Sequence, residues 1–468
     1  MIEILDLAND FLWSYIVLIL LVACAIIFTI RLHGVQFTMF GESLRQLRHS
    51  SGNGRIGGFQ AFAVSLSSRV GTGNLAGVAS AIFIGGPGAI FWMWIMALLG
   101  SATAFVEATL AQLYKQRGKD SFYGGPAYYM QRGLHRRWMG ILFAVLITIT
   151  FGLANQIVQS NTLCDALGST AQVCISSGMS LDEWRVIFGT VLTLATLAII
   201  FGGIQRISRF SSIVVPIMAI GYLLLGIVII AMNVSIIPEI LKTIIDSAFG
   251  LEQFAGGAIG TTIVMGVKRG LFSNEAGEGS APNAAAIAHT SHPVKQGLLQ
   301  SLGVFTDTIV ICTCTAFIIL IAGIYNGNDD GIILTTKSLE AEVGIAGRYF
   351  ITAAIFLFAY STVIANYFYG ETNIRFITDK KWAIQTFRIL TGGVVLSGAF
   401  LALETAFSIV DICMGIMTIV NLVAIFLLSD KAVRLLKDYR QQLKDGKDPE
   451  FHKSVLDEET QRDIECWE

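Results

Sequence analysis

The chain has 468 residues, of which 54% are hydrophobic and only 14% are charged, whereas charged residues make up about 25% of an average soluble domain. This composition excludes an ordinary soluble protein and predicts one that spans a membrane. The formal net charge of -2, with no basic face to neutralise phosphates, excludes a nucleic-acid partner.

Eleven apolar segments follow one another along the chain, each close to the roughly 20 residues that cross a hydrocarbon layer about 30 Å thick. The predicted transmembrane helices lie at residues 11–32, 59–84, 86–115, 138–163, 184–203, 210–233, 254–289, 296–325, 347–372, 384–403 and 405–429. Two shorter amphipathic stretches, 236–249 and 332–344, are predicted to lie at the membrane interface. We therefore expect an all-α integral membrane protein with one membrane domain over residues 1–429 and a charged tail over residues 430–468.

The placement of Lys and Arg predicts the orientation, because positively charged loops resist translocation and stay in the cytoplasm. The loops on one side of the membrane, together with the tail, hold 25 of the 32 Lys and Arg residues. The loops and helix edges on the other side hold Arg185, Lys242, Lys337 and Arg348. Eleven helices with the N-terminus outside and the C-terminus in the cytoplasm satisfy every loop, as in a multi-pass protein of a plasma membrane of the bacterial inner-membrane type.

Two of the predicted helices carry polar, Gly-rich clusters where a membrane helix is normally apolar. The second helix contains SSRVGTGN (67–74), and the seventh contains VKRGLFSNEAGEGSAPN (267–283). Glycine destabilises a helix interior by about 1 kcal/mol relative to alanine, and a charge at membrane depth costs several kcal/mol. We therefore predict that helices 2 and 7 are discontinuous and that their unwound segments line a polar cavity.

The two clusters match each other at a constant offset of 200 residues. The matching pairs are Arg69 and Arg269, Asn74 and Asn274, Ala76 and Ala276, Gly77 and Gly277, and, in the following helices, Ser101 and Ser301, Phe105 and Phe305, and Glu107 and Asp307. Because the discontinuous helices are five apart, the pattern predicts a 5+5 inverted repeat, helices 2–6 and 7–11, after one extra N-terminal helix. Coincidence in a Gly- and Ala-rich chain is the alternative. Inverted repeats place a solute site near the membrane midplane, so the pattern predicts a secondary transporter.

A long motif of unusual composition, GGPGAIFWMWIMALLG (85–100), directly follows the first discontinuous helix. It is accompanied by SSRVGTGNLAGVA (67–79), GGPAYYM (124–130), GVKRGLFSNEAGEGSAPNAAA (266–286), HPVKQGL (292–298), GVFTDT (303–308) and STVIANYFYGE (361–371). Together these motifs, spread over nearly the whole chain, resemble the alanine or glycine:cation symporter family, the sodium:alanine symporters. The resemblance implies a leucine-transporter-type fold and uptake of small neutral amino acids such as alanine or glycine, coupled to Na⁺ or, in some members, to H⁺.

An amino-acid substrate brings a carboxylate, an ammonium group and a side chain, and each needs a different partner. We predict that the backbone N–H groups of Gly71, Thr72 and Gly73 bind the carboxylate at the start of a half-helix, with the Thr72 hydroxyl as a further donor. The alternative is that these glycines only allow close helix packing. At position 366 the chain has Asn, where the family also admits a Trp in contact with the substrate, so Asn366 leaves the size of the pocket open.

The second break supplies the predicted partners of the ammonium group and the side chain. Carbonyls freed at 270–275 and the Asn274 amide are predicted to receive the ammonium group, with Ser273 as a further candidate. Phe272 and Ala276 are predicted to form apolar walls around a methyl-sized side chain, although Phe272 could equally be ordinary core packing.

A coupling Na⁺ needs oxygen ligands. The repeat predicts one site between carbonyls near Ser68 and Val70 and the hydroxyls of Ser361 and Thr362 in the ninth helix, with Asn74 as a candidate for a second ion or for the substrate. Adjacent Ser and Thr in membrane helices also commonly bond back to carbonyls of their own helix, and this is the alternative.

Charged residues within the apolar segments are predicted to act as gates. Arg69 is predicted to help close the inner vestibule and Arg269 the outer one. Their predicted partners are Glu107, Glu275, Glu278 and Asp307. Structural ion pairs are the alternative. Gln156, Gln159 and Asn161 form a polar stripe on the fourth helix that either lines the pathway or ties helices together.

Three rival functions are weighed against amino-acid symport. A channel normally shows pore-lining rings or filter loops rather than paired helix breaks. A membrane enzyme would need a catalytic set, and no HExxH motif or GxSxG elbow with triad partners occurs. Within transporters, glutamine or another neutral amino acid is the alternative substrate.

Cys164 and Cys174 flank a predicted outer loop, as a disulfide pair or as two free thiols.

Overall fold

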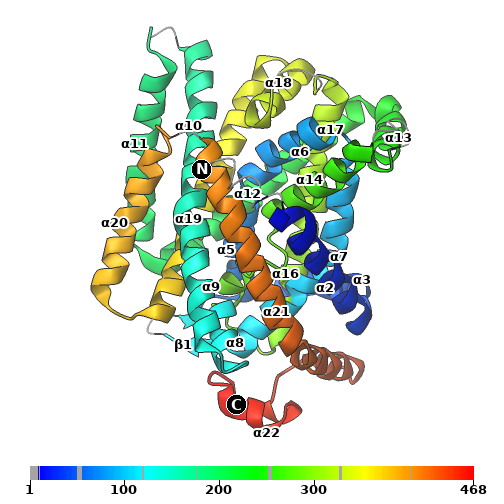
Figure 1. Cartoon of the computed structure of the whole chain (residues 1–468), viewed down its shortest axis with the longest axis vertical. Helices are drawn as coiled ribbons and strands as arrows, with labels where there is room; N and C mark the ends of the chain where they lie inside the picture. The colour runs from blue at the N-terminus through cyan, green and yellow to red at the C-terminus, as the bar shows by residue number, and fades with distance from the viewer. Residues whose placement is uncertain are drawn as a thin grey trace.

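The computed structural model describes residue 9 and residues 11–49, 55–118, 121–175, 178–250, 256–325, 329–401 and 403–467. This part of the chain is helical apart from loops and one short antiparallel sheet, β1 (Gln116–Arg117) paired with β2 (Phe122–Tyr123). Most of the long helices run roughly along the long axis of the molecule (Figure 1). The β1 strand, α8 and the C-terminal segment lie together at one end, which we call the basic end.

Eight of the described helices are long and apolar enough to cross a membrane. They are Leu12–Arg31, Gly88–Leu113, Arg137–Cys174, Leu181–Ile200, Gly203–Met232, Pro293–Ala322, Ile345–Ile377 and Phe407–Lys444. The other three predicted segments, 59–84, 254–289 and 384–403, contain shorter helices. The chain is therefore an all-helical integral membrane protein.

The first half of the chain contains the predicted extra helix and the first of the two segments predicted to be discontinuous. Its elements are η1 (Leu12–Val17), α2 (Leu18–Arg31), α3 (Val35–Thr38), α4 (Phe40–His49), α5 (Gly58–Arg69), η2 (Gly73–Gly77), α6 (Val78–Gly85), α7 (Ala89–Leu113), α8 (Pro126–Arg132), α9 (Arg137–Ile149), η3 (Thr150–Ala154), α10 (Asn155–Cys174), α11 (Leu181–Ile200), α12 (Gly203–Met232) and η4 (Val234–Ile236). Since α9, η3 and α10 form one continuous helix, Cys164 and Cys174 lie on the same helix, and both are free.

The second half begins with a short helix at the predicted interfacial stretch 236–249. Its elements are α13 (Ile237–Ala248), α14 (Gly256–Asn274), α15 (Ala281–Ala285), α16 (Pro293–Val304), η5 (Phe305–Cys312), α17 (Thr313–Ala322), α18 (Gly331–Val343), α19 (Ile345–Ile377), α20 (Lys381–Ser397), α21 (Leu403–Lys444), η6 (Lys453–Val455) and α22 (Glu458–Asp463). The α18 helix corresponds to the other predicted interfacial stretch. Both α13 and α18 lie at the end opposite the basic end (Figure 1).

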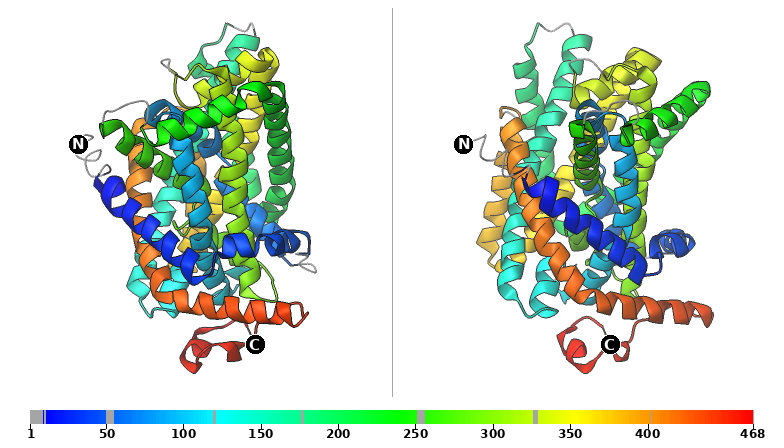
Figure 2. Two further views of the ribbon diagram at one scale, coloured as in Figure 1. Left: turned by 90° about the vertical axis from the view of Figure 1, so that its right-hand side faces the viewer. Right: turned by 45° about the vertical axis from the view of Figure 1, so that its right-hand side comes forward.

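Helices that are equivalent in the predicted repeat pack against one another. The third predicted helix, α7, contacts the eighth, which begins with α16, and the fourth, which includes α10, contacts the ninth, α19. The half-helices make reciprocal contacts, because α5 of the second predicted helix packs on α16 of the eighth and α15 of the seventh packs on α7, the third. The extra N-terminal helix α2 lies outside this arrangement, against α7 and α21 (Figure 2).

The first predicted discontinuous segment consists of two half-helices in the structure. The α5 helix ends at Arg69 because Val70 leaves the helical region, with φ -80° and ψ 88°. Helical turns resume at Gly73 in η2, which continues into α6. The Gly71 N–H group donates to Asn74 Oδ1 at 2.9 Å, so a side chain of the second half-helix reaches back to the break.

The second predicted discontinuous segment is interrupted over a longer stretch. After α14 ends at Asn274, Glu275 adopts a left-handed backbone conformation with φ 56°, which is uncommon for a residue other than glycine. Gly279 follows with φ 84°. A Cβ atom at Gly279 would lie 2.7 Å from Pro126 Cγ and 2.8 Å from Phe143 Cζ, so glycine is required here both by the backbone and by close packing.

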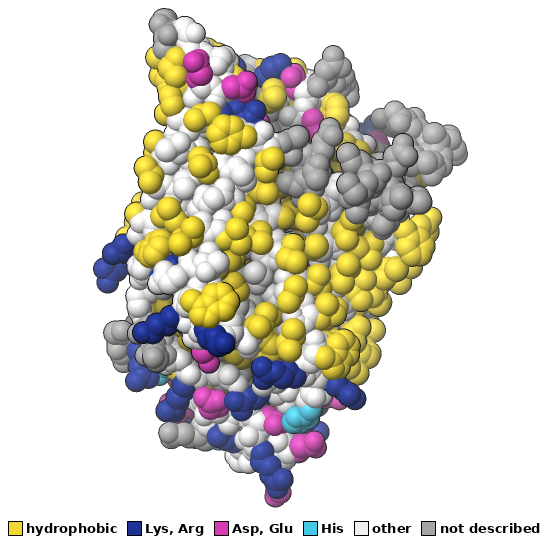
Figure 3. Space-filling view, turned by 60° about the vertical axis from the view of Figure 1, so that its left-hand side comes forward, with side chains coloured by type: hydrophobic (Ala, Val, Ile, Leu, Met, Phe, Trp, Pro, Cys, Tyr) yellow, Lys and Arg dark blue, Asp and Glu magenta, His cyan; other side chains and the backbone are white. Residues whose placement is uncertain are grey.

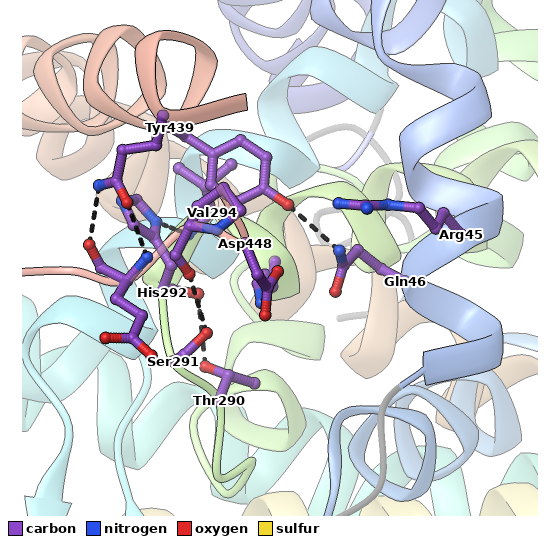
Figure 4. Close-up of polar contacts among 12 residues, drawn as sticks. Arg45, Gln46, Thr290, Ser291, His292, Val294, Tyr439 and Asp448 are labelled. Carbon is purple, nitrogen blue, oxygen red and sulfur yellow. Dashed lines mark hydrogen bonds and ion pairs between the residues drawn. The ribbon is translucent and has the colours of Figure 1, made fainter. Parts of the chain in front are cut away.

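The last helix continues past the predicted membrane boundary at residue 429. The final part of α21 runs along the base of the molecule, and the residues after it fold back on the basic end (Figure 2). The Phe451 N–H group donates to the Ser291 carbonyl oxygen at 2.9 Å. The centroid of the His292 ring lies 5.0 Å from that of Tyr439 (Figure 4). It lies 5.7 Å from that of Phe451. The charged tail is therefore packed against the loop that precedes α16.

The outer surface has the pattern expected of a membrane protein. Hydrophobic side chains cover the middle of the face in Figure 3, and Lys and Arg side chains gather below them toward the basic end. This separation matches the asymmetric distribution of Lys and Arg in the sequence.

Candidate functional site

The two breaks meet at the start of η2 and the end of α14. A Cβ atom at Gly73 would lie 3.2 Å from Phe272 Cδ1 and 3.3 Å from Ser273 Cα. The absence of a side chain at Gly73 thus lets the two interrupted segments approach each other. The predicted carboxylate and ammonium halves of the site are adjacent in the structure.

The N–H groups of the first break already hold oxygen acceptors. The Thr72 N–H group donates to Gln159 Oε1 at 3.2 Å, and the Thr72 hydroxyl is buried without a hydrogen-bond partner in the described part of the chain. Gln159 is thus the member of the predicted polar stripe that reaches the break. Gln156 and Asn161 instead donate to the carbonyl oxygens of Val363 and Gly398, at 3.0 and 2.9 Å, and tie helices together.

Four backbone carbonyl oxygens converge on the Thr362 hydroxyl. They belong to Ser67, Phe358, Val70 and Ser68, and their distances from Thr362 Oγ1 are 2.9, 3.0, 3.3 and 3.4 Å respectively. A hydroxyl has one proton and can donate it to only one of them at a time. The remaining carbonyl lone pairs face the same small volume, which is the donor set that Na⁺ prefers at an unwound helix.

The other two predicted residues on α19 face different neighbours. The Ser361 hydroxyl donates to the Phe358 carbonyl at 2.9 Å, within its own helix, and lies 3.7 Å from Met218 Sδ. Its side chain therefore follows the back-bonding alternative. Asn366 Oδ1 lies 2.7 Å from Ser68 Oγ, so Asn366 contacts the first break.

Asp307 connects the two breaks through neutral hydrogen-bond donors. Its carboxylate accepts from Asn74 Nδ2 at 2.6 Å, from Ser273 Oγ at 2.7 Å and from Thr308 Oγ1 at 3.0 Å. Asn274 in turn donates to Thr308 Oγ1 at 3.1 Å. Asp307 thus lies beside the predicted substrate and ion residues, and within the described chain it forms no ion pair with Arg69 or with Arg269.

Glu107 was also predicted as a gate partner of the arginines, but in the structure it contacts the second break. Its carboxylate accepts from Asn421 Nδ2 at 2.9 Å and from the Gly277 N–H group at 3.3 Å, so it caps the second break. Glu275 accepts from the Ser68 and Ser280 hydroxyls. The carboxylate of Glu278 is buried, and neither oxygen has a partner among the residues that the structure describes.

Arg69 is buried among these carboxylates without a direct ion pair to any described residue. Its Nη1 atom donates to the Gln300 carbonyl oxygen at 3.1 Å, whereas Nε and Nη2 have no partner in the described part. The Arg269 guanidinium lies 5.5 Å from the centre of the Phe407 ring. The predicted gate pairs of Arg69 and Arg269 with Glu107 and Asp307 are therefore not formed in this conformation, because neutral donors occupy both carboxylates.

The ion pair near the second break involves a different lysine. Lys268 Nζ lies 2.5 Å from Asp411 Oδ2. Asp411 is the only charged residue in the predicted segment 405–429, a signal that sequence reasoning missed.

Ala276 packs against Gly100 of α7 rather than against Phe272, since a Cβ atom at Gly100 would lie 3.1 Å from that of Ala276.

The chemistry of the site is that of hydroxyls, amides, carbonyls and isolated carboxylates. Within the described ranges, no group of three or more His, Cys, Asp or Glu residues is placed to hold a metal ion. Thr72, Asn74, Ser273 and Thr362 are all buried, so the centre is closed to both faces. Groups of these kinds are the ones that a zwitterion or an alkali cation would need as partners.

The fold is similar to that of a solved amino-acid complex. The crystal structure of MhsT in complex with L-phenylalanine matches with a TM-score of 0.55 and 12% sequence identity, over 87% of this chain and 92% of that one. At this identity the likeness bears on the fold alone. The chain therefore has the overall fold of that structure, the leucine-transporter-type fold that the resemblance implied.

Relatives at higher identity define the family. The model of the sodium:alanine symporter family matches residues 1–453. The chain is 47% identical to the Bacillus subtilis protein named probable sodium/glutamine symporter GlnT, over 99% of this chain and 96% of that one. It is 38% identical to the sodium/alanine symporter AgcS of Methanococcus maripaludis, over 94% of this chain and 97% of that one. The chain therefore belongs to the sodium:alanine symporter family, as the resemblance predicted, and performs sodium-coupled amino-acid symport.

Proposed function

We propose that the chain couples inward movement of Na⁺ to the uptake of a small neutral amino acid such as alanine or glycine. The observation that carries this proposal is the convergence of carbonyl oxygens from the first break on Thr362 of α19. An ion held there would join the first half of the repeat to the second, so its binding would stabilise the closed centre. Cation binding and closure around the substrate would thereby be linked.

The substrate would occupy the junction of the two breaks. Its carboxylate would replace Gln159 Oε1 at the Thr72 N–H group and would receive the free Thr72 hydroxyl. Its ammonium group would face the carbonyl end of α14, where Ser273 and Asn274 lie, and Phe272 would cover its side chain. Asp307 and Asn74 would form a second cation site beside it.

Transport would follow from rocking of the two halves around this centre. In the proposed topology the chain crosses the membrane eleven times, and the second and seventh helices are discontinuous. The basic end faces the cytoplasm. Opening toward the cytoplasm requires Arg69 to leave the Gln300 carbonyl. Opening toward the outside requires the region around Lys268 and Asp411 to separate.

Glutamine is the second candidate substrate. The relative at 47% identity is named as a probable sodium/glutamine symporter, and Asn366 is smaller than the Trp that the family also admits at that position. H⁺ is the alternative coupling ion, since another relative, 41% identical, is named as a putative sodium/proton-dependent alanine carrier. Both alternatives concern specificity within the same transport cycle.

Uptake into proteoliposomes tests the proposal. Labelled alanine, glycine, serine and glutamine are offered under an imposed Na⁺ gradient or an imposed pH gradient. We expect Na⁺-driven uptake of alanine or glycine, and the pH gradient alone should drive little. If glutamine outcompetes alanine, the substrate assignment changes. If no amino acid accumulates in response to either gradient, symport itself is refuted.

The Thr362→Ala variant tests the ion site in the same assay. Removing the hydroxyl should raise the Na⁺ concentration for half-maximal uptake at least tenfold while exchange of substrate across the membrane persists. Thr352→Ala is the matched control, because Thr352 lies on the same helix and bonds to Thr170, away from the break. Unaltered Na⁺ activation in Thr362→Ala would remove this residue from the ion site.

A further inference from the structure

A large polar cavity opens at the basic end, outside the transport centre. Its volume is about 890 Å³, and it lies between β1, β2 and α8 on one side and the junction of α19 with α20 on the other. The charged residues that line it are Arg117, Arg137, Arg375, Asp379, Lys381 and Arg388. Five of these six are cationic.

The positive charge of the cavity is only partly neutralised. Arg375 and Arg388 share one carboxylate, that of Glu371, at 2.5 and 3.7 Å. The other three cations, Arg117, Arg137 and Lys381, form no ion pair with any residue in the described ranges. The five cations, together with the carboxylates of Asp379 and Glu371, carry a formal charge of +3. A cavity of this charge attracts an anion.

Two tryptophans place the cavity at the membrane boundary. Trp138 and Trp382 directly follow Arg137 and Lys381 in the sequence, and their side chains are 64% and 66% exposed. Exposed tryptophans in membrane proteins gather at the level of the lipid headgroups. In Figure 3, Lys and Arg side chains gather just below the hydrophobic surface, toward the basic end. The cavity therefore lies at the depth where lipid phosphates are found.

We propose that this cavity binds a phosphate-bearing anion, the headgroup of an anionic phospholipid. Guanidinium groups suit phosphate because their N–H donors match two phosphate oxygens at once. Basic pockets between transmembrane helices on the cytoplasmic side are suited to such headgroups. A headgroup here contacts residues of both halves, from Arg117 and Arg137 on one side to Lys381 and Arg388 on the other. Free phosphate offers the same chemistry without the acyl chains.

Native mass spectrometry of the purified full-length protein in detergent tests the site. The probes are phosphatidylglycerol, phosphatidylcholine and inorganic phosphate, each added alone. We expect phosphatidylglycerol to remain bound with at least tenfold higher affinity than phosphatidylcholine. The variant Arg117→Gln, Arg137→Gln, Lys381→Gln should lose that preference. Equal binding of both lipids, or full preference in the triple variant, would refute the proposal.

A matched variant controls for the general loss of charge. Lys437→Gln, Lys444→Gln, Lys447→Gln removes the same number of exposed cations from the basic end, outside the cavity, and should keep the preference. If this control loses the preference equally, the attraction is a diffuse surface effect and the site is refuted. If inorganic phosphate binds as tightly as phosphatidylglycerol and depends on the same three residues, the lipid source is refuted in favour of free phosphate. Thermal unfolding of the triple variant near the wild-type temperature verifies that it is folded.

Discussion

Gly71 lies where the carboxylate half of the proposed substrate site meets the proposed ion site. A Cβ atom there would overlap the Thr362 hydroxyl and lie 3.2 Å from Gln159 Oε1. We therefore predict that Gly71→Ala reduces Na⁺-driven uptake at least tenfold, because it displaces groups from both sites at once. The measurement is initial uptake rate as a function of Na⁺ and of substrate concentration.

Gly77→Ala is the control for this prediction. Gly77 lies at the end of the same η2 turn, and an added Cβ atom there meets nothing within 4 Å. Its uptake should match that of the wild type. Equal uptake by Gly71→Ala and Gly77→Ala would show that the close approach between Gly71 and Thr362 has no functional consequence.

Residue types were predictable from the sequence, but the directions of their side chains were not. Thr362 and Ser361 are adjacent and chemically similar, yet only the Thr362 hydroxyl faces the first break. Adjacent residues point about 100° apart around the helix axis, so only one of the two can face the break. Which one does so depends on the rotation of the helix about its axis, and packing alone fixes that rotation. Likewise, Asp307 was assigned to a gate because of its charge, although three neutral donors hold it beside the predicted substrate residues.

At the scale of elements, the helix breaks were predicted because Gly and charged residues are costly inside membrane helices, and α5 and α14 end within the two predicted clusters. Their lengths were less predictable. The first interruption spans residues 70–72, whereas the second spans 275–280 and depends on a left-handed Glu275. No sequence pattern identifies a non-glycine residue in that conformation, since surrounding contacts impose it.

The C-terminal segment is an element whose packing was not predicted. Lys115 lies between the Phe122 and Trp467 rings, with its Nζ 4.3 and 4.4 Å from their centres, and it donates to the Ala288 carbonyl oxygen at 2.9 Å. Trp467 Nε1 donates to the Gln112 carbonyl oxygen at 3.0 Å. A charged tail is ordinarily expected to be solvated, and only tertiary contacts show that its aromatic residues are buried.

Burial lowers the pKa of Lys115 from 10.5 to about 7, so the packed tail favours the neutral amine. When the tail is released and Lys115 becomes exposed, its pKa returns to 10.5. The equilibrium constant for packing of the tail therefore increases as pH rises from 7 toward 10.5, by at most about tenfold per pH unit. Packing is weakest below pH 7, where Lys115 is protonated in both states. We predict that trypsin releases the tail of the detergent-solubilised protein more slowly at pH 9 than at pH 7, relative to Lys115→Met. The ratio to this variant cancels the pH dependence of the protease. A ratio that is constant with pH would contradict the prediction.

At the scale of the whole molecule, the class and the family followed from composition and motifs, whereas the offset of 200 residues led to the prediction of an inverted repeat. The contacts of α7 with α16 and of α10 with α19 agree with this predicted repeat. Membrane helices need a minimum length, so their approximate positions can be found in one sequence. The extension of α10 to Cys174 was missed because its polar residues resembled a loop.

The predicted topology places Cys174 outside the cell and Cys466 in the cytoplasm. Cys174 is free and exposed, whereas Cys466 is partly buried in the packed tail. We predict that a membrane-impermeant maleimide added to intact cells labels Cys174, and that Cys466 reacts only after permeabilisation, because positively charged loops keep the basic end in the cytoplasm. Mass spectrometry of labelled peptides measures both sites, and Cys174→Ser should abolish labelling in intact cells. Labelling of Cys466 before permeabilisation would reverse the orientation, and with it the direction assigned to each half-helix of the transport centre.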